Sequence, residues 1–154
     1  MTIRSLATVL AALLLAAAHP SLAAAQEASA DTGAVRVEGP TLVAFFPPVT
    51  QAQVDADDEL ATVLDDFSFH LSQATDPLRK GGVAVHVRFA ERVRLEGEVA
   101  ERDFAIADPD GDVGYYLVAP GRPPRVFRGV MTDIDLLQAA EEYFGLRLLD
   151  PEQP

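Results

Sequence analysis

The sequence predicts an α/β sandwich in which helices flank a mixed central sheet. Three observations predict it: a continuous apolar strand at residues 41–46, an amphipathic helix from residue 55 to about residue 77, and a closing hairpin and helix within residues 114–145. A strand, a helix and a second strand imply a parallel pair joined by a right-handed crossover. The closing hairpin and helix then complete a layered α/β domain.

The N-terminal segment, residues 1–26, is typical of a secretory signal. Arg4 supplies its positive charge, residues 6–18 form an uncharged apolar run, and Ala23–Ala25 are small residues that suit a signal peptidase. This run is shorter than the roughly twenty residues that cross a bilayer. No cysteine is present for lipid attachment. We therefore expect a periplasmic or secreted protein whose mature form has no membrane anchor.

The remaining chain is long enough for one domain with one hydrophobic core. Residues 27–36 are small and polar, and we expect them to form a flexible leader. The domain itself is expected at residues 37–147, with a C-terminal tail at residues 148–154.

The composition excludes several classes of function. The whole chain has a formal charge of −12, and removal of residues 1–26 takes away only one charged side chain, Arg4, which leaves −13. Nucleic acids and anionic membranes are therefore not expected partners, because phosphate binding depends on Lys and Arg. The absence of cysteine excludes disulfides, thiolate metal sites and thiol–disulfide exchange.

The first strand and the first helix are predicted from the spacing of the apolar residues, which changes along this part of the chain. Thr41–Phe46 is continuously apolar and ends at two prolines, which cannot extend a sheet ladder. From Asp55 onward the apolar residues have helical spacing, and the first turn is rich in acids, which the helix dipole favours. The expected buried positions of this helix are Leu60, Val63, Leu64, Phe67, Leu71 and Leu78. Near Pro77 the helix is expected to end, followed by a glycine turn.

The next segments alternate with the period of a β-strand. Residues 83–89 place four apolar side chains on one face and Ala84, His86 and Arg88 on the other. Residues 93–95 and 104–106 alternate as well, which indicates a hairpin with a turn at Glu96–Gly97.

The C-terminal part predicts a second hairpin and a last helix. Residues 114–119 and 126–130 are strands joined by a turn rich in proline and glycine. Thr132 is a suitable N-cap, and Asp135 follows at capping-box spacing. The expected buried stripe of the helix, which Gly145 closes, is Ile134, Leu137, Ala140, Tyr143 and Phe144.

Two segments resemble the thioredoxin-like superfamily. GYYLVAPGRPPRVFRGVMTDIDLLQAAEEYF resembles its closing strand, glycine turn, strand and helix, and TLVAFFPPVTQAQ resembles its first strand running into the active-site loop. The resemblance covers roughly residues 38–145 and implies a thioredoxin-like sandwich. A ferredoxin-like α+β sandwich is the alternative fold.

The departures from that superfamily bear on function. Its two redox cysteines would fall at Thr50 and Gln53, which form no thiolate, and its cis-proline would fall at Val113–Gly114. The resemblance therefore implies a non-redox member that binds another protein, with candidate binding residues Pro48, Thr50, Gln53, Val113 and Gly114. Thr50 also has an ordinary structural interpretation, as the N-cap of a helix.

The remaining polar clusters carry no clear chemistry. The DPDGD segment begins like a calcium loop but lacks the later ligands, so a solvated turn is the better interpretation of Asp108, Asp110 and Asp112. Asp55, Asp57 and Asp58 are explained by the helix dipole. We therefore expect no metal and no cofactor.

The two histidines of the mature chain, His70 and His86, are isolated in sequence and have no ligand spacing. No nucleophile motif or glycine-rich phosphate loop is present. The leading hypothesis is an exported module that binds an envelope or extracellular protein. The alternatives are a small hydrolase or transferase in which a histidine meets a carboxylate only in three dimensions, and a carrier of a small ligand or cation.

Overall fold

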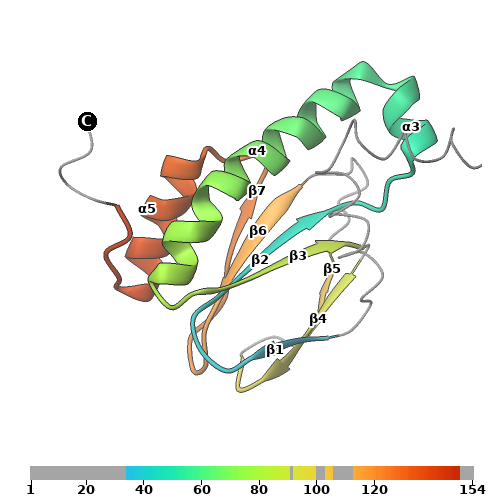
Figure 1. Cartoon of the computed structure of the whole chain (residues 1–154). Helices are drawn as coiled ribbons and strands as arrows, with labels where there is room; N and C mark the ends of the chain where they lie inside the picture. Colours follow the sequence, from blue (N-terminus) through green and yellow to red (C-terminus); the bar gives the residue numbers. More distant parts are fainter. Residues whose placement is uncertain (1–33, 91, 100–102, 106–112, 150–154) are drawn as a thin grey trace, which may run out of the picture.

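The computed structural model describes residues 34–90, 92–99, 103–105 and 113–149, and the side chains of residues 103–105 are not described. Two sheets and a helical layer make up the fold (Figure 1). The elements in chain order are β1 (Val35–Val37), β2 (Thr41–Phe46), α3 (Gln51–Ala56), α4 (Asp58–Lys80), β3 (Ala84–Phe89), β4 (Arg92–Gly97), β5 (Asp103–Ala105), β6 (Gly114–Val118), β7 (Arg125–Arg128) and α5 (Asp133–Phe144). The expected α/β class with a mixed central sheet is confirmed.

The main sheet has the strand order β3-β2-β6-β7. Strand β2 pairs in parallel with β3 and antiparallel with β6, and β6 pairs antiparallel with β7. Helix α4 connects the parallel pair, as the crossover rule requires. All six residues of β2 are buried, which explains why this strand is apolar without alternation.

Both long helices cover the same face of the main sheet (Figure 1). Leu42, Ala44 and Phe46 of β2 and Tyr115 and Leu117 of β6 belong to one core cluster with the buried residues of α4 and α5. In α4 these residues are Leu64, Phe67, Leu71, Ala74 and Leu78.

The opposite face of the main sheet is covered by a small sheet of order β1-β4-β5, where the sequence had led us to expect a helix on each face. Val43 and Phe45 of β2 and Tyr116 of β6 are buried there, and the ring centroids of Phe45 and Tyr116 lie 4.7 Å apart. The small sheet supplies Val35, Val37, Val93 and Leu95 to this second cluster. Alternating strands can close this face because one side of each is apolar.

Several boundaries differ from those expected. Val35 and Val37 are buried in β1, so this strand overlaps the stretch at residues 27–36 that was expected to be a flexible leader. At the other end, Leu148 and Leu149 pack against the main core, and their amides donate to the Glu141 carboxylate. These contacts hold the first two residues of the expected tail against α5.

The hairpin of β4 and β5 is present, with antiparallel pairing, but β4 continues through the expected turn at Glu96–Gly97. Glu96 and Gly97 instead lie opposite Arg36 and Val37 of β1. Gly97 has φ of +129°, and a Cβ there would lie 2.6 Å from the carbonyl oxygen of Val37. This glycine therefore permits close approach of two strands.

The helical segment expected from Asp55 divides into α3 and α4 at Asp57. Asp57 has extended backbone angles and accepts hydrogen bonds from the amides of Glu59 and Leu60, both at 3.0 Å, as an N-cap does. At its other end α4 continues past Pro77, because fully buried Leu78 anchors the last turn against the core.

Helix α5 begins and ends as expected. Thr132 Oγ1 accepts a hydrogen bond from the Asp135 amide at 3.2 Å, and Gly145 takes the left-handed C-cap conformation. The expected buried stripe is partly wrong. Leu137 and Ala140 are buried together with Leu136 and Ala139, whereas the Ile134 side chain is 55% exposed.

Candidate functional site

The candidate surface lies where β2 ends and α3 begins. Pro48, Thr50 and Gln53 are exposed there, as is Ala52 between them. The start of β6 lies beside it, because Phe45 near the end of β2 pairs with Gly114. The topology thus brings together the two segments that the sequence analysis singled out.

The polar side chains of this surface are engaged with one another in a capping box. Thr50 Oγ1 accepts from the Gln53 amide at 3.3 Å, and Gln53 Oε1 accepts from the Thr50 amide at 2.8 Å and from its hydroxyl at 3.0 Å. The structural interpretation of Thr50 as an N-cap is therefore confirmed. These hydrogen bonds tie both side chains to the first turn of α3.

Val113 and Gly114 lie below the surface. Val113 is 4% exposed, and Gly114 is buried. A Cβ at Gly114 would lie 2.4 Å from Cζ of Phe45 and 2.5 Å from the carbonyl oxygen of Phe127. Glycine is required here because three strands meet closely, and the two residues position the surface rather than form it.

His70 meets a carboxylate at the junction of α4 and α5. Its Nδ1 lies 3.0 Å from Oδ1 of Asp133, the first residue of α5, and 3.4 Å from the Asp133 amide nitrogen. This is the arrangement that the hydrolase alternative requires of a histidine. Within the described part of the chain, however, no serine or threonine hydroxyl is bonded to the imidazole. The pair links helices α4 and α5.

Two of the acidic residues at the start of the helical layer, Asp55 and Asp57, accept local hydrogen bonds. Asp57 caps α4, and Asp55 accepts from Gln51 Nε2 at 2.6 Å. In the described ranges no group of three acidic or histidine side chains is placed to hold a metal ion. The three aspartates of the DPDGD segment lie outside the described residues.

The tyrosines belong mainly to the core. Tyr115 and Tyr116 are buried, one on each face of the main sheet. Burial raises the pKa of Tyr115, although a hydrogen bond from the Met131 amide opposes the shift. The hydroxyl of half-buried Tyr143 donates to the Pro123 carbonyl at 2.9 Å. The hydroxyls of Tyr115 and Tyr143 thus hold neighbouring loops in place.

Sequence reasoning missed two exposed apolar side chains on the helices, Phe69 at 59% and Ile134 at 55%. They flank the His70–Asp133 pair in sequence. The sequence contains one signal for the exposure of Phe69. This residue lies off the apolar stripe of the predicted helix, among acidic and polar residues.

No family model, curated protein or solved structure matches this chain. Among the residues that the structure describes, no helix has both the length and the apolar character needed to cross a bilayer.

Proposed function

We propose that this chain is an exported, non-redox, thioredoxin-like domain that binds a protein of the cell envelope. The strand order β3-β2-β6-β7, with β2 and β3 parallel and β6 antiparallel to β2, supports the thioredoxin-like assignment. The crossover by α4 and the closing helix α5 on the same face also support it. The N-terminal signal supports export.

Binding is favoured over catalysis by one observation, the chemistry of the exposed turn after β2. In redox members this turn carries two cysteines, and here their places hold Thr50 and Gln53, whose side chains close a capping box. What remains for a partner is the exposed ring of Pro48, the methyl group of Ala52 and the backbone between them. Such a surface suits contact with another polypeptide, in which shape and apolar area matter more than charge.

The turn is also rigid enough to present a defined surface. Pro47 and Pro48 restrict the backbone, and Val49 and Val54 pack against the main core on either side of Thr50. A partner that binds this turn loses little free energy in ordering it.

The proposal is tested by co-purification from the cell envelope with quantitative mass spectrometry. The full chain, which carries its own signal at residues 1–26, is expressed as the parent, as Pro48→Arg, and as Gln73→Arg, which places the same charge at an exposed position of α4. We expect at least one partner to be depleted about tenfold with Pro48→Arg and retained with Gln73→Arg. Circular dichroism of both variants checks that the fold is kept. Equal recovery with all three proteins would overturn the proposed surface.

A further inference from the structure

Strand β3 is one edge of the main sheet, on the side of β2 away from β6 and β7 (Figure 1). Its hydrogen bonds to β2 determine which of its backbone groups point outward. The Ala84 amide donates to the Pro40 carbonyl and the Ala90 amide to the Phe46 carbonyl, and β2 and β3 pair in register between them. In a parallel ladder alternate residues bond to the same neighbour. His86 and Arg88 therefore bond to β2, and Val85, Val87 and Phe89 direct their N–H and C=O groups away from the sheet.

The same three residues carry half-exposed apolar side chains. Val85, Val87 and Phe89 lie on the helix face and pack against the margin of the main core. The Phe89 ring lies 5.8 Å from that of Phe46, so this row continues the aromatic packing of β2 toward the open edge. An added strand with apolar side chains on this face would extend the core under α4.

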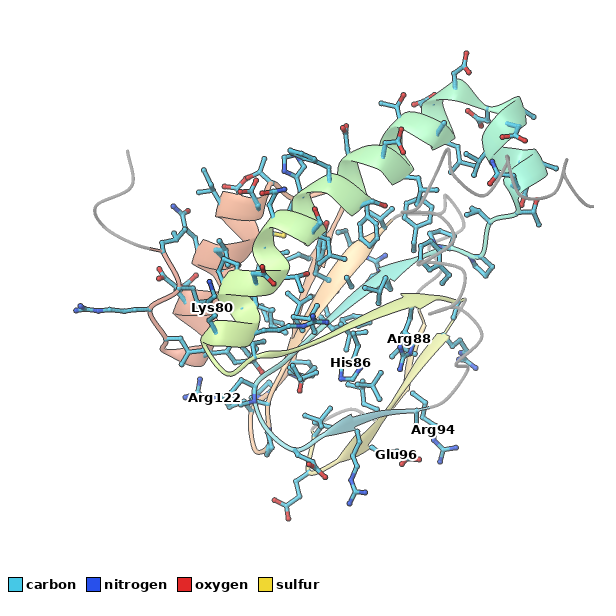
Figure 2. All side chains as sticks on the ribbon, in the orientation of Figure 1. Lys80, His86, Arg88, Arg94, Glu96 and Arg122 are labelled. Atoms are coloured by element: carbon cyan, nitrogen blue, oxygen red, sulfur yellow. The ribbon has the colours of Figure 1, made fainter. Side chains whose placement is uncertain are left out.

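The two edges of the main sheet differ. Strand β7 has four residues, is preceded by Pro123 and Pro124, and carries an arginine at each end, which are ordinary means of preventing edge pairing. Strand β3 has six residues and no proline, and extends for about 20 Å at 3.3 Å per residue. Its charged and imidazole side chains, Arg88 and His86, extend on the side of the small sheet (Figure 2). The β3 edge is thus the longer and more apolar of the two.

We propose that a second copy of the chain pairs with this edge, β3 against β3 in antiparallel orientation, around a two-fold axis at Val87. The apolar row of β3 is self-complementary, because this register places Val87 opposite Val87 and Val85 opposite Phe89. All of these side chains lie on one face of the sheet. Each of these facing pairs exchanges two N–H···O bonds. The result is one continuous sheet across the dimer, in which the apolar rows of the two copies lie side by side on one face.

Arg88 makes a bond in the single copy that competes with this pairing. Its Nη1 donates to the outward carbonyl of Val87 at 3.0 Å. Pairing replaces this bond with a backbone N–H of the second copy, so the carbonyl stays satisfied. In the dimer, Val85 and Phe89 form bonds between the two copies, and their side chains become more buried.

The dimer is tested by sedimentation velocity of the chain from residue 27 at concentrations from about 1 to 200 µM. We expect a concentration-dependent shift from monomer to dimer. Val87→Pro removes an outward N–H and leaves the ladder to β2 intact. Because it removes both bonds of the central pair, it should raise the dimer Kd at least about tenfold.

Val126→Pro is the matched control. The Gly129 amide donates to the Val113 carbonyl, and in this antiparallel pair alternate residues of β7 bond to β6. Val126 therefore directs its backbone groups away from the sheet, and Val126→Pro makes the same change at the opposite edge. It should dimerise like the parent. A monomer throughout the concentration range would overturn the proposal, and this is also the result expected if β3 binds only a strand of another protein. A dimer that Val87→Pro leaves unchanged would overturn it as well.

Hydrogen exchange of the parent decides the matter if Val87→Pro fails to fold. The amides of Val85, Val87 and Phe89 should become at least about tenfold more protected at 200 µM than at 5 µM, while the Val126 amide should not change. Equal protection of the β3 amides at both concentrations would also overturn the pairing.

Discussion

Substitution of Gly114 by alanine tests how closely β2, β6 and β7 approach one another in the main sheet. The added Cβ would lie 2.4 Å from Cζ of Phe45 and 2.5 Å from the carbonyl oxygen of Phe127. Phe45 is 1% exposed and stacks on Tyr116, so its ring cannot move into solvent without leaving the core. The Phe127 oxygen belongs to β7, so relief of the second contact requires a shift of backbone.

The magnitude follows from these two contacts. Overpacking of a core by a methyl group costs about 1–3 kcal/mol. We expect Gly114→Ala near the upper end, about 3 kcal/mol, because rotation of a side chain cannot relieve a clash with a backbone atom. For a domain of this length such a loss lowers Tm by roughly 10 °C.

The assay is urea unfolding followed by far-ultraviolet circular dichroism, with Gly39→Ala as the matched control. Gly39 has no atom within 4 Å of an added Cβ and no positive φ, so its substitution should change the free energy of unfolding by less than about 0.5 kcal/mol. If Gly114→Ala were as stable as Gly39→Ala, the close approach of β2, β6 and β7 would be refuted.

Two further predictions concern α5. The amides of Leu149 and then Leu148 lower the pKa of Glu141, so its contribution to stability is present above the usual carboxyl pKa of 4.5 and is lost as pH falls through the lower folded value. The urea midpoints of the parent and Glu141→Gln should therefore differ most at pH 7 and converge near pH 3; a constant difference would contradict this. Thr132→Ala removes the N-cap acceptor of the Asp135 amide and should cost about 1 kcal/mol in the same assay at pH 7, and an unchanged midpoint would show that the cap contributes nothing.

Elements set by local signals could be predicted from the sequence. Thr132 and Gly145 mark the ends of α5 because capping depends on residues a few positions apart. The uninterrupted apolar run of β2 indicated burial on both faces, which the two core clusters confirm. The division of the helical segment into α3 and α4 at Asp57 could not be predicted, because an aspartate is equally suited to the first turn of a longer helix and to a new N-cap.

Features that depend on distant pairing could not be predicted. Strand β1 is short, and its partner is β4, about sixty positions later, so its role appears only when Val35 is seen opposite Leu95. The exposure of Ile134 has a similar cause. It lies at helical spacing with Leu137, but α4 and the main sheet cover α5 over Leu136, Leu137, Ala139 and Ala140.

The two candidate segments are adjacent in the structure, but their exposure could not be predicted. The turn after β2 and the start of β6 lie side by side because Phe45 pairs with Gly114. Burial of Val113 and Gly114 follows from the contact of β6 with β2 and β7, which spacing along the chain does not reveal.

The central claim, that the turn after β2 binds a protein, is tested most directly by photo-crosslinking in the cell envelope. A photoreactive residue is placed at Ala52, which is exposed and outside the capping box, and in a second protein at Gln73 of α4 as the control. We predict a specific protein adduct from Ala52 that is absent from Gln73. The absence of any adduct at Ala52, or the same adducts from both positions, would contradict a binding surface at this turn.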